Sequence, residues 1–118
     1  MRKKILLIDD DESILSLLQV FLTSRDLEVF TAQNGLEGME LLKKMTPDLI
    51  VLDVMMPQMD GYGFLVEARK DPKTHATPVV VLTAREMMRD VFVQEGVRDF
   101  ITKPCDPEEL YKILLKYL

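Results

Sequence analysis

Short apolar runs alternate along the chain with segments whose apolar residues recur every three or four positions. Three of the runs, residues 5–8, 49–52 and 79–82, contain no polar residue. A strand that is apolar on both faces is typical of a parallel sheet with helices on both sides. We therefore expect these three runs to be central strands. Two less apolar strands are predicted at residues 28–32 and 100–102.

Five helices are predicted between and after these strands, because apolar residues recur there at helical spacing. In the first two, the expected inward faces include Leu17 and Leu36, respectively. Pro47 is expected to end the second helix, since the residue before a proline avoids helical geometry. Asp106 is expected to cap the last helix, with Pro107 at its first position. The first helix is predicted to begin near residue 12. The next three cover about residues 36–45, 62–70 and 87–95, and the last begins at residue 107.

Strict alternation of strands and helices indicates an α/β fold with a parallel sheet between two helical layers. Right-handed crossovers leave few topologies for such a chain. The most common one, taken from known folds rather than worked out from the residues, is flavodoxin-like: a three-layer (βα)5 arrangement with strand order 2-1-3-4-5. A chain of 118 residues suits one compact domain, so we expect a single domain over residues 1–118.

Composition excludes several classes of function. The net charge is −5 and no basic patch is present, which argues against direct binding of nucleic acid. No apolar run approaches the ~20 residues of a membrane span, and no signal-peptide pattern is visible, so we expect a cytoplasmic protein. The single cysteine, Cys105, cannot form an internal disulfide. It is interpreted as a small apolar side chain, buried or half-buried, rather than as a reactive thiol.

Polar residues follow four of the predicted strands. Asp9 and Asp10 follow the first strand, Asp53 the third, Thr83 the fourth and Lys103 the fifth. In open α/β sheets, ligands bind outside the carboxyl ends of the strands, where the winding direction reverses. The first and third strands are neighbours there in the expected order. The three aspartates should therefore lie close together.

Three crowded carboxylates repel one another unless a cation lies between them. Mg²⁺ prefers oxygen ligands, and an aspartate beside such an ion can act as a nucleophile toward phosphorus. Lys103 and Thr83 would then contact phosphoryl oxygens. Separately, each residue has a plainer explanation: acids favour helix N-termini, and an aspartate often ends a strand. Only the combination, on one edge of one sheet, is specific.

With these residues the chain resembles the response-regulator receiver family over about residues 4–118. The resemblance implies a phosphorylation-activated signalling switch, which catalyses only its own phosphotransfer and autodephosphorylation and is otherwise not an enzyme. The segments that carry it are Ile8-Asp9-Asp10-Asp11, Leu49-Ile50-Val51-Leu52-Asp53-Val54-Met55-Met56-Pro57, Met59-Asp60-Gly61, Val81-Leu82-Thr83-Ala84 and Ile101-Thr102-Lys103-Pro104.

The resemblance also implies roles for the acidic residues. Asp53 would be the phosphoacceptor, and the donor would be a phosphohistidine on a sensor histidine kinase or a phosphotransfer protein. The metal, Mg²⁺ or Mn²⁺, would be held by Asp9, Asp10, Asp53 and the main-chain carbonyl of Met55, with Asp10 a more direct ligand than Asp9.

Three further residues would act with the phosphoryl group, two of them, Thr83 and Phe100, as the switch. Lys103 would bind the phosphoryl group, and its bond to Pro104 is cis in the family, as prolines allow. Thr83 would move toward that group, and Phe100 would turn inward behind it. The family's output face, which comprises the fourth helix, fifth strand and fifth helix, would then control an output domain or a separate effector. Phosphorylation-dependent homodimers also occur in the family.

The sequence departs from the family pattern at several positions. Phe100 lacks the hydroxyl of the usual tyrosine, and Cys105 replaces a bulky aromatic residue. The segment 85–96 is a couple of residues shorter than usual, which affects the output face. Met55 and Arg85 occupy variable positions that tune hydrolysis in the family.

Three alternative functions make different demands on the sequence. An aspartyl-phosphate phosphatase would place a second aspartate two residues after the nucleophile, where this chain has Met55. A flavin or nucleotide carrier would need a glycine- or hydroxyl-rich loop after the first strand, where this chain has three aspartates. A structural relative that never binds phosphate would have lost the acceptor, the acids or the lysine, and all of these are present.

Overall fold

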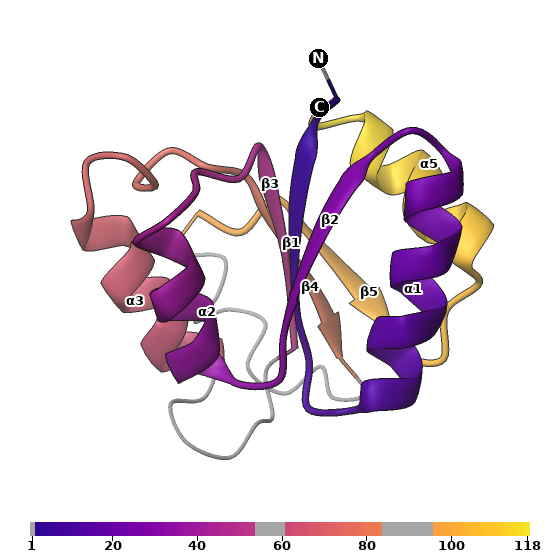
Figure 1. The fold of residues 1–118 in the computed structure, drawn as a ribbon, viewed down its shortest axis with the longest axis horizontal. Coiled ribbons are helices and arrows are strands. Elements are labelled where there is room, and N and C mark those ends of the chain that lie inside the picture. The colour runs from indigo at the N-terminus through magenta and orange to yellow at the C-terminus, as the bar shows by residue number, and fades with distance from the viewer. Residues whose placement is uncertain (1, 54–60, 84–95) are drawn as a thin grey trace.

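The computed structural model describes residues 2–53, 61–83 and 96–118. Within them, five parallel strands form one sheet in the order β2-β1-β3-β4-β5, which confirms the predicted flavodoxin-like arrangement (Figure 1). The strands are β1 (Lys4–Ile8), β2 (Glu28–Ala32), β3 (Leu49–Leu52), β4 (Val79–Thr83) and β5 (Asp99–Thr102).

Helices cover both faces of this sheet. In Figure 1, α2 and α3 lie on one side of the strands, and α1 and α5 lie on the other. The predicted helix at 87–95 lies outside the described residues. No helix of the described segments is long and apolar enough to cross a bilayer. The helices are α1 (Glu12–Ser24), α2 (Gly35–Leu42), α3 (Gly61–Lys70) and α5 (Pro107–Leu115).

Side-chain caps fix where three of these helices begin. The carboxylate of Asp11 accepts hydrogen bonds from the first-turn amides of α1, and Asn34 does the same for α2. Asp106 caps α5 by accepting from the amide of Glu108, and Pro107 follows it, as the sequence predicts. Such caps satisfy amides that have no partner inside the helix. The cap of α1 is therefore fixed two residues after Asp9.

The sheet separates two apolar layers because successive side chains of each strand point to opposite faces. In β1, Leu6 and Ile8 pack with α2 and α3, whereas Ile5 and Leu7 pack with α1 and α5. The four side chains are almost completely buried, which explains why residues 5–8 of this strand are all apolar.

Two details of the predicted helices are wrong. α2 ends at Leu42, three residues before the predicted end. The amide of Met45 donates a hydrogen bond to the carbonyl of Leu41 in the turn that follows the helix. The chain leaves the helix early because the Asp48 amide must reach the carbonyl of Lys4 to begin β3, at 2.8 Å. The inward faces predicted for α1 and α2 were also too wide, since Leu17 and Leu36 are exposed.

Candidate functional site

The carboxyl ends of β1 and β3 bring three aspartates together. Residues Ile8 and Leu52 are register partners in the two strands, so the residues that follow them are neighbours. Asp9 and Asp53 are buried, whereas Asp10 is exposed. One carboxylate oxygen from each of these three residues lies within 4.8 Å of the others. The crowding predicted from the strand order is thus present.

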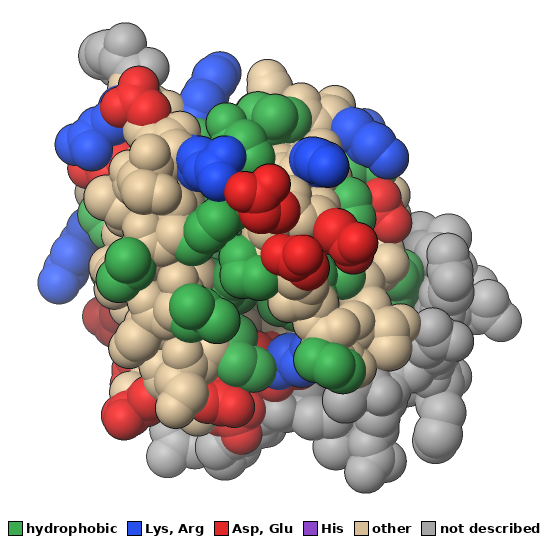
Figure 2. Space-filling model, turned by 90° about the vertical axis from the view of Figure 1, so that its right-hand side faces the viewer, with side chains coloured by type: hydrophobic (Ala, Val, Ile, Leu, Met, Phe, Trp, Pro, Cys, Tyr) green, Lys and Arg blue, Asp and Glu red, His purple; other side chains and the backbone are tan. Residues whose placement is uncertain are grey.

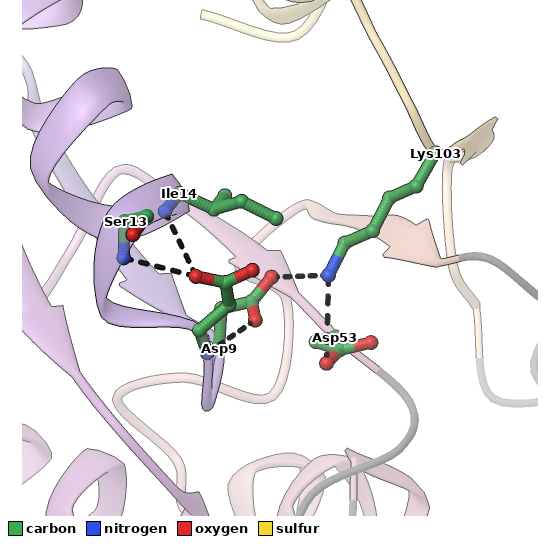
Figure 3. Close-up of polar contacts among 6 residues, drawn as sticks. Asp9, Ser13, Ile14, Asp53 and Lys103 are labelled. Carbon is green, nitrogen blue, oxygen red and sulfur yellow. Dashed lines mark hydrogen bonds and ion pairs between the residues drawn. The ribbon is translucent and has the colours of Figure 1, made fainter.

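Lys103 lies over two of these carboxylates (Figure 3). Its Nζ is 2.6 Å from Oδ2 of Asp9 and 3.6 Å from Oδ2 of Asp53. The lysine follows β5, so its side chain crosses the end of β4 to reach the acids. The Lys103–Pro104 peptide bond is cis, as the resemblance implies. Lys103 was expected to contact only the phosphoryl group, and no feature of the sequence indicates its contact with Asp9.

Both oxygens of Asp9 have partners. Oδ1 accepts a hydrogen bond from the amide of Asp11 at 2.9 Å, and Oδ2 binds Lys103. Asp11 in turn caps α1, so the acidic site and the start of this helix form one hydrogen-bonded unit (Figure 3). Asp9 is therefore held in place, whereas the exposed Asp10 has the more open position for contact with a cation.

Among the described residues, three carboxylates face one ammonium group, so their charges do not balance. Oxygen donors in a tight cluster with excess negative charge suit a hard divalent cation such as Mg²⁺, which binds carboxylates and retains some of its waters. The donor set of Asp9, Asp10 and Asp53 therefore fits the metal that the resemblance implies. Asp10 is exposed, so water can supply further ligands to such an ion.

The remaining predicted residues fall partly within the described segments. Thr83 is the last residue of β4, in register with Thr102 of β5, and so belongs to the same edge of the sheet. Phe100 is partly buried against the apolar layer of α2 and α3. Met55 and Arg85 lie outside the described residues, as does nearly all of the shortened segment 85–96. The roles of Met55, Thr83 and Phe100 stay predictions.

Cys105 is half-buried beside the site, two residues after Lys103. Burial raises the pKa of its thiol, and the negative charges of Glu109 and Asp106 raise this pKa further. A raised pKa keeps the thiol protonated at neutral pH, and the protonated form is a poor nucleophile. These properties favour the interpretation of Cys105 as a small apolar side chain.

Alkylation of Cys105 by iodoacetamide at pH 7.5 is therefore expected to be slower in the folded protein than in the urea-unfolded chain. The double change Asp106→Asn and Glu109→Gln removes the two charges that raise the thiol pKa and should accelerate the reaction of the folded form. Mass spectrometry over time measures both rates. Equal rates for folded and unfolded chains would show that the thiol is an ordinary exposed one.

Comparison with known proteins supports the family that the sequence motifs indicate. The chain matches the family model of the response regulator receiver domain over residues 5–115. It is 41% identical over 117 residues to the response regulator Rre1 of Synechocystis, covering 97% of this chain and 51% of that protein. The chain spans about half the length of several curated relatives that it matches.

Solved structures are similar along the whole chain. The chemotaxis protein CheY4 of Vibrio cholerae superposes with a TM-score of 0.95 at 31% sequence identity, with 100% of each chain covered. The response regulator TrrA of Thermotoga maritima, solved in complex with Mg²⁺ and beryllium fluoride, has a TM-score of 0.86 at 30% identity and covers 98% of this chain and 99% of its own. This chain belongs to the response regulator receiver family of two-component signalling proteins.

Proposed function

We propose that the protein is a phosphorylation-activated switch in which Asp53 accepts a phosphoryl group from the phosphohistidine of a sensor histidine kinase or phosphotransfer protein. Receiver domains are signalling domains rather than classical enzymes. The observation that carries the proposal is the buried Asp53 carboxylate, with two further acids and the Lys103 ammonium grouped around it. Phosphoryl transfer needs positioned charges more than it needs covalent machinery, and this site supplies them.

The transfer exchanges one bond to phosphorus for another. An oxygen of Asp53 forms the new P–O bond, while the P–N bond to the donor imidazole breaks and its electron pair stays on the nitrogen. Lys103, whose Nζ is 3.6 Å from Oδ2 of Asp53, is placed to bind an oxygen of the arriving group. Asp9, Asp10, Asp53 and the Met55 carbonyl would hold Mg²⁺ or Mn²⁺. Such an ion neutralises charge on the phosphoryl oxygens when it is bound.

The switch follows from the present pairing of Lys103 with Asp9. A phosphoryl group adds about two negative charges and competes for the same ammonium. Thr83 would contact this group, and Phe100 would move inward from its partly buried position. The changed surface of the segment 85–96, β5 and α5 would then control an output domain or an effector. Formation of a homodimer is one way in which it could do so.

Three other expectations belong to this proposal. They are the single domain over residues 1–118, the cytoplasmic location, and the absence of direct contact with nucleic acid. Autodephosphorylation of Asp53 is also part of it.

A small phosphodonor such as acetyl phosphate is expected to add the mass of one phosphoryl group to the protein in the presence of Mg²⁺. Asp53→Asn should show no mass gain, because the amide is not a nucleophile toward phosphorus, and excess EDTA should prevent the gain in the wild type. Intact-protein mass spectrometry gives both results.

Asp26→Asn is the matched control, because Asp26 is exposed and lies in a left-handed turn that asparagine also tolerates. This variant should be labelled like the wild type. Labelling that persists in Asp53→Asn would refute the assignment of the acceptor. Steady turnover of a phosphate ester such as p-nitrophenyl phosphate would instead indicate an enzyme.

A further inference from the structure

The strand β2 forms one edge of the sheet, with β1 as its only neighbouring strand among the described residues. In Figure 1 it passes in front of β1, with α2 on one side of it and α1 on the other. All of its residues pair with β1 in unbroken register, so it carries no bulge. Residues 29–32 include no charged side chain and no proline, which natural proteins often place on an edge strand to prevent further pairing. β2 is therefore a regular edge without the usual protection.

Alternate residues of β2 direct their backbone groups away from β1. The amide of Glu28 donates to the carbonyl of Lys3 at 2.9 Å, so residue 28 faces β1. Because hydrogen-bonding groups alternate sides along a strand, Val29 and Thr31 direct their amides and carbonyls to the open side. Within the described segments only one of these four groups has a partner: the carbonyl of Val29 accepts from the side chain of Gln19 at 3.5 Å. This distance is long for a hydrogen bond, so the Gln19 side chain is easily displaced.

Two apolar side chains of β2 are only partly covered. Val29 packs against the layer of α1 and α5, and Phe30 packs against the layer of α2 and α3, and both are half-buried. Helices cover the two faces of the sheet, and Figure 2 shows the side chains of α1 and α5 over one of them. Only the edge is left for a further strand. Such a strand would place its own side chains beside Val29 and Phe30 and cover their exposed parts.

A polar hollow of about 220 Å³ lies at the carboxyl end of this edge. Its lining includes Glu12 of α1, Glu37 of α2, and Thr31 and Gln33. Gln33 connects the two acids, since its side-chain amide donates to Glu12 at 2.6 Å and its backbone amide donates to Glu37 at 2.9 Å.

The hollow carries uncompensated negative charge. Glu12 and Glu37 are both exposed, and neither forms an ion pair within the described part of the chain. Acidic side chains gather at the lower left of Figure 2, at the end of the molecule where α1 begins. A cationic side chain would be attracted to this end of the edge, whereas an anionic one would be repelled.

We propose that the open edge of β2 pairs with an extended segment of a partner protein, which adds a strand to the sheet and places a Lys or Arg beside Glu12 and Glu37. In strand addition, main-chain hydrogen bonds supply affinity and side chains supply specificity. Here the main-chain bonds would go to Val29 and Thr31, and the basic residue would select the partner.

A second copy of this chain fits the edge less well. Two-fold symmetric pairing would run the two β2 strands antiparallel, so the polar hollow of one copy would approach the amino end of β2 in the other. That end carries the exposed Asp26 and the half-buried Glu28. Like charges placed opposite each other on paired strands are destabilising. The charge of the edge therefore favours a basic partner over a second copy.

Hydrogen exchange in the whole ¹⁵N-labelled protein tests whether the edge is open. The amides of Val29 and Thr31 are expected to exchange with D₂O much faster than those of Glu28 and Phe30, which face β1. Protection of Val29 and Thr31 that grows with protein concentration would show that a second copy occupies the edge. Equal protection of all four amides at every concentration would show that the chain itself covers it. Either result would overturn the proposal.

Three synthetic peptides test the occupant. The first alternates Val and Thr and has a Lys near each end, so that a Lys reaches the polar hollow in either strand direction. The second has Glu in place of Lys, and the third keeps Lys but carries methyl groups on its backbone amides. Only the first is expected to shift the amide signals of residues 28–33 and to slow exchange at Val29 and Thr31. No shift with the first peptide, or an equal shift with either of the others, would overturn the proposal.

A pair of double variants tests the polar hollow. Glu12→Gln with Glu37→Gln removes both charges but keeps oxygens to which Gln33 can donate, and it should weaken the first peptide by about fivefold to tenfold at low salt. Glu40→Gln with Glu67→Gln removes two exposed charges elsewhere, on α2 and α3, and should leave binding unchanged. Equal weakening by both double variants would mean that only net charge matters, which would overturn the proposal.

Thr31→Pro tests the backbone contact. Proline removes the amide on the open side, and the fold should survive because this amide does not bond to β1. Binding of the first peptide should be lost, whereas Thr31→Val keeps the amide and should bind like the wild type. Binding that persists in a folded Thr31→Pro variant would overturn the proposal. If that variant does not fold, the two double variants and the methylated peptide still decide.

Discussion

Lys103→Met is expected to lower the free energy of unfolding in EDTA by about 2–3 kcal/mol. The change removes the ammonium group and leaves the buried carboxylates of Asp9 and Asp53 beside each other without it. Breaking a fully buried ion pair from one side costs about 3–5 kcal/mol, and the expected loss is smaller here because solvent reaches the site at Asp10. Methionine keeps most of the length and the apolar stem of the lysine, so packing changes little.

Mg²⁺ should then stabilise the variant more than it stabilises the wild type. A ligand that binds only the folded state adds stability in proportion to the logarithm of its concentration over its dissociation constant. Without Lys103 the carboxylates attract the cation more strongly, so the dissociation constant should fall. Urea unfolding in EDTA and at several concentrations of Mg²⁺ measures both effects.

Lys70→Met is the matched control for this experiment. Lys70 forms a 3.2 Å ion pair with Glu67 on the surface of α3, and both side chains are exposed. Exposed pairs contribute little because water already solvates the two charges. If the two variants lose the same stability, or if Mg²⁺ stabilises the wild type more than Lys103→Met, then Lys103 does not neutralise the acidic site.

The strands were accessible from the sequence because residues 5–8 of β1 and all of β3 are buried on both faces, and such segments contain only apolar residues. Their order came from the most common topology of known folds. Once the order is known, the meeting of Asp9 with Asp53 follows from register alone. The end of α2 was not accessible in this way. The apolar spacing continues to Met45, but the hydrogen bond from Asp48 to β1 decides where the chain must leave the helix.

Side-chain contacts across the sheet were also beyond the sequence. The contact of Lys103 with Asp9 depends on how far a flexible side chain extends over the end of β4, which no spacing records. The exposure of Leu17 is a similar case. Leu17 has the helical spacing of a core residue, but it borders an unfilled groove between α1 and the segment that leads into α5.

The second large effect is expected at Gly38, in the middle of α2. Helix propensity alone predicts that Gly38→Ala stabilises the protein by about 1 kcal/mol. A Cβ atom at this position would however lie 2.7 Å from Cδ1 of Ile8 and 2.9 Å from Cε1 of Phe64. Both neighbours are fully buried and cannot move away without displacing others. We therefore expect a net loss of about 1–2 kcal/mol, since overpacking outweighs propensity.

The same substitution should reach the functional site, because Ile8 immediately precedes Asp9. Displacement of Ile8 moves the end of β1, so Gly38→Ala should also weaken the binding of Mg²⁺. The double variant with Phe64→Leu tests the cause: the smaller side chain makes room for the new methyl group. Its loss of stability in urea should then be smaller than the sum of the two single losses, as is usual for residues in contact. Strict additivity, or a Gly38→Ala variant more stable than the wild type, would mean that α2 can move away from β1 and that close packing does not require glycine here.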